Sequence, residues 1–420
     1  MYYKRGLSRQ TLWLVSFAGL PYFMYGSLLV VIYLLVSALW LRSRQIGQAC
    51  HQAGFSWLAA ALLLSASVGL NRGDAFLQLV NFLPFFALWG VFVTQPQVVA
   101  RPFAVLEKLA WWLVMGGVPM CAIALIEYGL KLGPVVPRVK ALALPEWFVS
   151  RLYEGYYLTE IRTRGMFDNP NILGGYLVII LGLGLGLLLK ALSDGKSGAA
   201  RRTGWLGTAI ALCLAALFCS GSRNGMLVTL VLIAIALYRA RHYKWVWLSS
   251  LVGLGAIVVA AANVGVGGRS LSLSLFTSDV RFQVWPLALD MIQSRPWLGW
   301  GLSGFRDYYI AGTIPGYDYL FHPHNIFLFL AVGAGIPATL GFCLSVGTIV
   351  YRATKAYVGH DAYGPLSSQK KALLFSYLLG FLGCVLFSML DVVLFDARLN
   401  VLTWGILAAL YVLPLTLKQR

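Results

Sequence analysis

Two of the five histidines in this chain lie two positions apart, in the stretch Phe321-His322-Pro323-His324-Asn325. The stretch stands where a long irregular segment meets the start of an apolar run. Imidazole is the side chain whose unperturbed pKa lies nearest neutrality, so it can take a proton from a hydroxyl group. The pair therefore predicts a general base, with His324 favoured and His322 as the second candidate.

Several arginines stand in polar segments that could reach an anionic substrate. Guanidinium binds phosphate oxygens in bidentate fashion. Arg164 and Arg223 favour this function most, because each lies in a turn rich in Gly, Ser or Asn that lets the backbone approach a ligand. The candidate anion-binding residues are Arg164, Arg223, Arg281 and Arg162, and the candidate supporting residues are Asn169, Asn171, Ser222, Asn325 and Arg398.

Each candidate also has a structural explanation. An arginine at a helix end commonly snorkels or pairs with an acid, and this explanation stays open for Arg162, Arg281 and Arg398. The histidine pair could cap the helix that follows, since Pro323 and Asn325 are ordinary residues at a helix start. Metal binding is the remaining alternative, but no third ligand stands out nearby, so no metal is expected.

Composition fixes the class of protein that must position these residues. The 420 residues are 59% hydrophobic and 11% charged, with a mean hydropathy of +0.75. A membrane-spanning helix needs about 20 apolar residues, and such runs recur along the chain. We predict an all-α polytopic membrane protein, one transmembrane domain over 1–420. The expected spans, about twelve, are 11–25, 27–41, 55–71, 75–95, 104–130, 170–191, 204–220, 224–238, 245–264, 324–351, 372–391 and 398–417.

The formal charge of +18 is explained by topology rather than by nucleic-acid binding. With both termini in the cytoplasm, twenty of the 33 basic residues but three of the 15 acids fall on inner segments, so the inner side carries +17 of the +18. This follows the positive-inside rule. It places His322 and His324 on the outer side, which excludes nucleic acid as a partner.

Two outer segments, 131–169 and 265–323, are too long to be simple turns, and long loops commonly carry function. We expect the first to rest on the membrane as short helices because of its tyrosines and tryptophan. In the second, Asp279 precedes an amphipathic pattern of Val284, Leu287 and Met291, which indicates a capped helix. The following Trp297-Leu-Gly-Trp300-Gly stretch suggests a lid.

Two other patterns are expected to be structural. The six cysteines form no CxxC pair and lie mostly in apolar runs, so we expect reduced packing residues. The run Gly182-Leu-Gly184-Leu-Gly186 looks like a dinucleotide-binding loop only in its letters. It lies inside an apolar span without a strand before it, so it indicates close helix packing.

The motifs together resemble the O-antigen ligase and polymerase superfamily. They are Arg164-Gly-Met-Phe-Asp-Asn-Pro-Asn171, Gly221-Ser-Arg223, Arg281 followed by Trp285, Pro296-Trp-Leu-Gly-Trp-Gly301 and His322-Pro-His324-Asn325. Their order along residues 160–345 also matches. Each motif is weak by itself, but five in register on one expected face of the membrane are fairly specific.

The resemblance implies a GT-C-like, metal-independent glycosyltransferase of the bacterial inner membrane, without cofactors, whose active site faces the periplasm. Its donor would be an undecaprenyl diphosphate-linked glycan, and in the ligase branch its acceptor would be the lipid A core oligosaccharide, with membrane lipids around it. Arg164 and Arg223 would hold the diphosphate, and Arg281 would reach in from the outer helix. His324, or less favourably His322, would deprotonate the acceptor hydroxyl.

Three alternatives stay open beside the ligase. An O-antigen polymerase joins repeat units to each other, and a protein O-oligosaccharyltransferase transfers glycan to serine or threonine. A transporter of lipid-linked glycan is the alternative outside enzymes. Transporters place ionisable groups near the middle of the bilayer, whereas those of this chain lie almost wholly at the ends of the expected spans.

Overall fold

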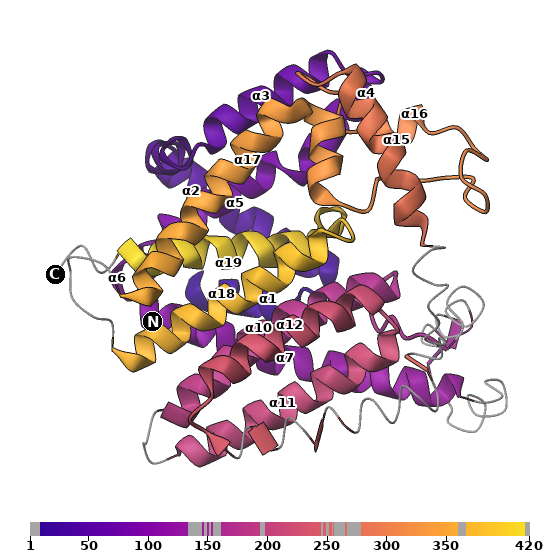
Figure 1. Ribbon diagram of the computed structural model, residues 1–420. Helices are drawn as coiled ribbons and strands as arrows, with labels where there is room; N and C mark the ends of the chain where they lie inside the picture. Colours follow the sequence, from indigo (N-terminus) through magenta and orange to yellow (C-terminus); the bar gives the residue numbers. More distant parts are fainter. Residues whose placement is uncertain are drawn as a thin grey trace.

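The computed structural model is a bundle of helices of very different lengths (Figure 1). It describes residues 9–132, 161–193, 198–244, 279–359 and 367–415, with residues 145, 146, 149, 150, 153, 247, 248, 252, 253, 255, 265 and 266 between them. Within these residues the secondary structure is helical apart from turns, bends and isolated bridge residues, such as the bridge between Ile314 and Tyr317. This confirms the all-α class.

Eight helical segments among the described residues are long and apolar enough to cross a membrane. One of them, Arg72–Val93, consists of α4 (Arg72–Gln78), η1 (Leu79–Asn81) and α5 (Leu83–Val93). The other seven are α2 (Met24–Gln52), α7 (Pro102–Lys131), α10 (Pro170–Ser193), α11 (Ala199–Ser220), α17 (Ile326–Val358), α18 (Ser368–Ser388) and α19 (Ala397–Leu415).

The remaining helices are shorter. They are α1 (Arg9–Gly19), α3 (Phe55–Ser67), α6 (Pro96–Ala100), α12 (Arg223–Arg239), α15 (Val280–Ser294), α16 (Gly304–Tyr308) and η2 (Val393–Phe395). Eight of the twelve expected spans thus coincide with membrane-length helices. The spans expected at 11–25, 55–71 and 224–238 are helices of 11, 13 and 17 residues. Most of the span at 245–264 lies outside the described residues, so the number twelve stays a prediction.

The two expected outer loops are described in part. Most of the short helices predicted in 131–169 fall outside the described residues. In 265–323 helix α15 stands where the amphipathic helix is expected; its Val284 and Met291 are buried, and Asp279 caps its first turn. Residues 267–278 lie outside the described part.

Helix α10 lies in the centre of the bundle and packs against α18 through its glycines (Figure 1). A Cβ at Gly182 would lie 2.7 Å from the backbone of Gly380, and one at Gly186 would overlap Ser376. The Ser376 hydroxyl donates a hydrogen bond to the Leu183 carbonyl at 2.6 Å. The glycine run therefore allows two helix backbones to approach closely, as the sequence indicates.

Helix α17 is interrupted at Gly335, where φ is 81° and ψ is 167°. The stretch 296–301 fills the gap: Trp300 and Gly301 donate backbone hydrogen bonds to the carbonyls of Val332 and Gly333, both at 2.9 Å, and Ile336 donates to Pro296 at 2.8 Å. Backbone groups freed by a helix break inside a membrane protein need such partners. The stretch is therefore a fixed support of α17, and its interpretation as a lid is wrong.

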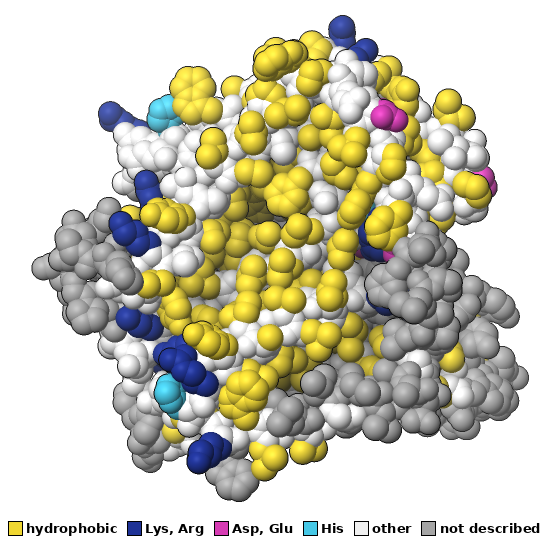
Figure 2. Space-filling view, in the orientation of Figure 1, with side chains coloured by type: hydrophobic (Ala, Val, Ile, Leu, Met, Phe, Trp, Pro, Cys, Tyr) yellow, Lys and Arg dark blue, Asp and Glu magenta, His cyan; other side chains and the backbone are white. Residues whose placement is uncertain are grey.

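Basic residues stand at the end of the bundle opposite the histidines. Helices α10, α12 and α17 all begin near the histidines, and their last turns at the opposite end carry Lys190, Arg239 and Lys355. Figure 2 shows Lys and Arg side chains along one edge of the molecule and a broad hydrophobic surface beside them. We refer to the end that carries His322 and His324 as the histidine end.

Candidate active site

The two histidines precede α17 at its capped start. The Asn325 side-chain oxygen accepts hydrogen bonds from the N–H groups of Phe327 and Leu328, at 2.8 and 3.0 Å, so Asn325 is the N-cap. His324 has φ of 53°, the one left-handed backbone among the described residues other than glycine. Such a conformation is costly for a side chain with a Cβ and is found where surrounding structure enforces it.

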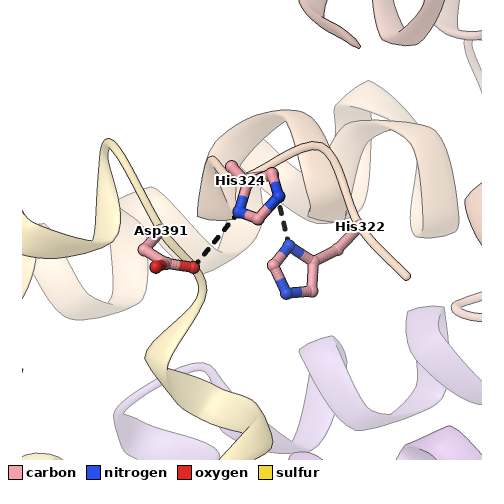
Figure 3. A group of neighbouring side chains, drawn as sticks. All are labelled: His322, His324 and Asp391. Carbon is pink, nitrogen blue, oxygen red and sulfur yellow. Dashed lines mark hydrogen bonds and ion pairs between the residues drawn. The ribbon is translucent and has the colours of Figure 1, made fainter. Parts of the chain in front are cut away.

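His324 faces an aspartate from another part of the chain (Figure 3). Its Nδ1 lies 3.4 Å from Oδ1 of Asp391, in the segment between α18 and α19. Burial alone raises the pKa of the Asp391 carboxyl, but the hydrogen bond and charge of His324 and the N–H of Val392 outweigh burial, so that the pKa is lowered. A carboxylate at Nδ1 fixes the ring orientation and leaves Nε2 for proton transfer.

The second histidine, His322, contacts the backbone of His324. Its Nδ1 accepts a hydrogen bond from the backbone N–H of His324 at 3.2 Å, and its ring stacks on Phe395 with centroids 5.1 Å apart. Burial, followed by the positive charges of His324 and Arg281, lowers the pKa of His322 to about 4, although Asp391 opposes the shift. A neutral imidazole that accepts from the backbone is suited to positioning His324.

The segment 387–398, between α18 and α19, connects the histidines with the other candidate residues. Its Met389 carbonyl accepts from the Asn325 side-chain amide at 3.0 Å, and its Phe387 carbonyl accepts from Asn224 on α12 at 2.9 Å. Asp391 and Phe395 contact the histidines. This connecting segment, of which the sequence analysis singled out Arg398 alone, therefore links the parts of the candidate site.

Arg281 reaches the same segment from α15. Its Nε donates to the Leu390 carbonyl at 2.6 Å, and its Nη1 pairs with Asp279 at 2.8 Å. On the same helix, Trp285 Nε1 donates to the Pro323 carbonyl at 3.0 Å, between the two histidines. The prediction that Arg281 reaches in from the outer helix thus agrees with the geometry, although the guanidinium also holds the helix start.

Arg162 and Arg164 lie buried in a second group at the start of α10. Arg162 donates to the Asn171 side-chain oxygen at 2.7 Å and to the Ser220 carbonyl at 2.9 Å. Asn169 accepts from the Asn171 N–H at 2.7 Å, which orders the first turn of α10. Arg162 and the two asparagines therefore build the turn. Arg164, 6% exposed, lies within it.

Arg223 begins α12 beside this turn. Ser222 is the N-cap of the helix, because its hydroxyl accepts from the Gly225 N–H at 3.2 Å, and it is buried. The predicted supporting role of Ser222 is thus to start the helix. Within the described part of the chain, no acceptor or acid engages the partly buried guanidinium of Arg223. Its position at a helix N-terminus favours an anionic partner.

Arg398 has a structural role. It is 4% exposed, pairs with both carboxylate oxygens of Asp396 at 3.0 Å, donates to the Met166 carbonyl at 2.9 Å and lies over the Phe167 ring at 4.2 Å. These contacts fasten the turn that carries Arg164 to the start of α19. Of its two open interpretations, pairing with an acid is the one that agrees with the structure.

The structure thus forms two groups at the histidine end. One holds His322, His324, Asp391 and Arg281, and the other holds Arg162, Arg164 and Arg223. The segment 387–398 joins them. Its Asp391 contacts His324, and its Phe387 and Arg398 contact Asn224 and Met166 beside the arginines. Sequence reasoning missed Asp391 as a site residue. Its available signal was an acid in a short connection beside the expected outer face.

An apolar cavity of about 500 Å³ extends from the site along α17, α18 and α19. Ile326, Phe327, Ser388 and Leu394 line it near the histidines, and Tyr357 and Phe375 line its far end. Figure 2 shows a hollow in the hydrophobic face over these helices. The lining of the cavity is mostly apolar, which suits an apolar ligand better than a polar solute.

A metal ion is the chemical alternative for the histidine group. One ligand atom from each of His322, His324 and Asp391 lies within 4.8 Å of the others, and two imidazoles with a carboxylate suit a divalent transition metal. The premise that no third ligand stands nearby is therefore wrong. The contacts among these three side chains are equally consistent with a general base. Activity in the presence of a chelator distinguishes a metal site from a general base.

The helices, the His–Asp pair and the buried arginines define a polytopic helical membrane protein with a polar site at one end of an apolar cavity. Residues 202–343 match a family model described as O-antigen ligase, which supports the predicted resemblance to the O-antigen ligase and polymerase superfamily. No curated protein matches the chain. The matched segment contains Arg223, Arg281, His322, His324 and Asn325, whereas Arg162, Arg164, Asp391 and Arg398 lie outside it.

Proposed function

We propose that this protein is an O-antigen ligase of the bacterial inner membrane. It transfers an O-antigen glycan from undecaprenyl diphosphate to the lipid A core oligosaccharide at the periplasmic face. The observation that carries the proposal is the pairing of His324 with Asp391 beside Arg281, in a chain whose residues 202–343 match O-antigen ligases. A base, fixed cations and room for a lipid tail are the apparatus that this reaction needs.

The arginines are proposed to hold the donor diphosphate. Arg223 is the first candidate, because its guanidinium has no partner among the described residues and stands at the start of α12. Arg164 lies in the adjoining turn, and Arg281 approaches from α15. Arg162 is proposed to orient this group, since its guanidinium already binds Asn171 and the Ser220 carbonyl. Fixed cations at a leaving diphosphate stabilise the transition state without a metal or an acid.

His324 is proposed to be the base. Its Nδ1 faces Asp391, so Nε2 takes the proton of the acceptor hydroxyl. The hydroxyl oxygen forms a bond to the anomeric carbon as the bond between that carbon and the diphosphate oxygen breaks, and undecaprenyl diphosphate leaves with the electron pair. A single displacement inverts the anomeric configuration. Asp391 stabilises the imidazolium that forms.

The cavity along α17, α18 and α19 is proposed to receive the polyprenyl chain. Its lining is almost wholly apolar, and one end lies beside the segment that carries Asp391. A polyprenyl chain in this cavity would put the diphosphate at the histidine end. The periplasm supplies no nucleotide sugars, so a donor activated by its own diphosphate also suits a site on that side.

A transporter of lipid-linked glycan agrees less well with the charges. The described ion pairs of the long helices lie near helix ends: Glu107 with Lys190 at one end of the bundle, and Glu127 with Lys131 at the other. Proton-coupled transporters place such groups near the middle of the membrane. Purified protein that moved lipid-linked glycan across liposomes, yet joined none to an acceptor, would contradict the enzyme proposal.

The deciding experiment compares native cells with a His324→Ala strain and follows both surface lipopolysaccharide and the glycan on undecaprenyl diphosphate. A ligase predicts that full-length polymer accumulates on the carrier while the lipopolysaccharide ladder disappears. Single repeat units on the carrier, and at most one on lipid A core, would indicate a polymerase instead. Loss of glycan from exported proteins with a normal ladder would indicate a protein O-oligosaccharyltransferase.

Removal of divalent metals tests the alternative chemistry of the histidine group. We expect purified enzyme to keep its rate in the presence of a strong chelator, because the arginines and the base account for the whole reaction. Inhibition that one divalent ion reverses would assign His322, His324 and Asp391 as metal ligands. The matched control is His322→Asn, which removes one ligand and should leave sensitivity to chelator unchanged if no metal acts.

A further inference from the structure

A buried ion pair lies in the last turns of α7, in contact with the turn that carries Arg162 and Arg164. Glu127 and Lys131 lie one helical turn apart, with Nζ and Oε1 separated by 2.8 Å, and are 4% and 2% exposed. Burying two charges is costly unless their remaining hydrogen-bonding capacity is satisfied. α7 precedes the matched segment 202–343, and neither residue stands in a motif.

The remaining bonds of this pair go to the backbone of the arginine turn. Glu127 Oε2 accepts from the N–H groups of Arg164 and Gly165, at 3.1 and 2.8 Å. Lys131 Nζ donates to the Arg162 carbonyl at 2.8 Å. The two side chains therefore hydrogen-bond to three consecutive peptide units of the turn. These bonds do not involve the guanidinium groups of Arg162 and Arg164.

The backbone of this turn depends on the glycine at position 165. Gly165 has φ of 53°, and a Cβ there would lie 2.8 Å from Met120 Sδ on α7. A carboxylate that accepts two adjacent backbone N–H groups can hold such a left-handed corner.

We infer that Glu127 and Lys131 are positioning residues of the donor site, which fix the backbone so that Arg164 meets the diphosphate. The inference rests on the proposed function of Arg164. Loss of the hydrogen bonds from Glu127 and Lys131 to this backbone should weaken the binding of the donor. It should leave the acceptor site, on the other side of the segment 387–398, unchanged.

The test uses full-length purified protein and two probes, undecaprenyl diphosphate without glycan for binding and the complete donor for kinetics. We expect Glu127→Ala to raise the donor KM and the Kd for undecaprenyl diphosphate at least tenfold, with an acceptor KM within twofold of native. Glu107→Gln is the matched control, because Glu107 lies at the opposite end of α7 and pairs with Lys190 and Arg202. It should change none of these constants.

A double variant separates positioning from general loss of structure. Glu127→Gln leaves Lys131 buried without a counter-charge, whereas Glu127→Gln/Lys131→Met removes both charges and keeps one oxygen for the two N–H groups. We expect the double variant to bind undecaprenyl diphosphate more tightly than Glu127→Gln. A purely structural role would lower Tm and the active fraction while KM and Kd stayed native.

Two failures can be told apart. Native protein that does not bind undecaprenyl diphosphate would overturn the proposed function itself. Native protein that binds it, together with folded Glu127→Ala that binds it equally well, would overturn the positioning role alone.

Discussion

The His324 imidazole is held from two sides by groups of different character. Asp391 contacts Nδ1, and the neutral His322 accepts the His324 backbone N–H from behind. His324 makes both contacts with a left-handed backbone, at φ of 53°. The proposed function therefore gives proton transfer to His324 and orientation to His322, although both are imidazoles with the same chemistry.

This division predicts the pH behaviour of a His322→Asn variant. The folded chain keeps His322 neutral down to about pH 4, whereas the unfolded chain binds a proton there below about pH 6.5. Native stability should therefore fall as pH drops from about 6.5 to about 4, and the variant should lose this dependence. Thermal unfolding across this range measures it.

The same variant should keep the acid limb of the native pH–rate profile, with a rate about tenfold lower from imperfect positioning of the base. His324→Asn should abolish transfer but retain donor binding. A shift of the acid limb in His322→Asn would instead make His322 the titrating base.

Arg223→Ala should raise the donor KM about ten- to a hundredfold, because a charge-assisted hydrogen bond contributes about 1.5–3 kcal/mol. Arg202→Ala is the control, since Arg202 lies near the start of α11 and pairs with Glu107 at the opposite end of the bundle. Donor titrations of both variants give the measurement. Equal donor affinity in Arg223→Ala and native protein would remove Arg223 from the site.

Residue types and local turns were sufficient to propose the histidines and most of the arginines that the structure places at the histidine end. They could not find the residue that completes the base, because Asp391 stands 67 positions from His324 and is a neighbour only in the fold. They also could not decide the role of Arg398, whose partners Asp396 and Met166 come from near and distant parts of the chain. Contacts between distant segments are what a sequence does not display.

At the scale of elements, interruptions in the helices are as important as the helices. α17 breaks at Gly335, and the stretch 296–301 supplies the missing backbone partners. Hydropathy predicts one continuous span at 324–351, since a break with satisfied backbone groups leaves the apolar pattern unchanged. Hydropathy also does not show that the Trp297–Gly301 stretch is bound to α17, because its backbone hydrogen bonds go to carbonyls of that helix. The stretch therefore suggested a lid.

Gly335→Ala tests this docking. The added Cβ would overlap the Trp297 carbonyl and meet a left-handed φ, so we expect a loss of roughly 2 kcal/mol or more of unfolding free energy. Gly341→Ala on the same helix has nothing within 4 Å of the new Cβ and should be neutral or slightly stabilising. Thermal unfolding in detergent compares them. Equal Tm values would show that the break tolerates a side chain.

Over the whole molecule, charge and hydropathy are organised along one axis. The eight membrane-length segments were predictable, because runs of apolar residues identify themselves without knowledge of packing. The cavity was not predictable, since α17, α18 and α19 line it together and its residues look like ordinary lipid-facing ones. A site at one end of an apolar cavity is therefore a property of the assembled bundle.

Filling the cavity tests whether it receives the polyprenyl chain. Gly347 lines it, and a Cβ there meets nothing within 4 Å, so Gly347→Trp can enter the cavity without a clash at its origin. We expect kcat/KM for an undecaprenyl donor to fall about tenfold, which corresponds to about 1.4 kcal/mol of lost apolar contact.

A donor with a short prenyl tail should be affected much less, because its chain would end before it reaches Gly347, in the second half of α17. Gly341→Trp, on the same helix but outside the cavity lining, is the control for a bulky ring facing lipid. The ratio of kcat/KM between the two donors is the decisive quantity, since a defect in folding or in the histidine group lowers both donors alike. An unchanged ratio in Gly347→Trp would place the tail elsewhere on the bundle and leave the chemistry at His324 untouched.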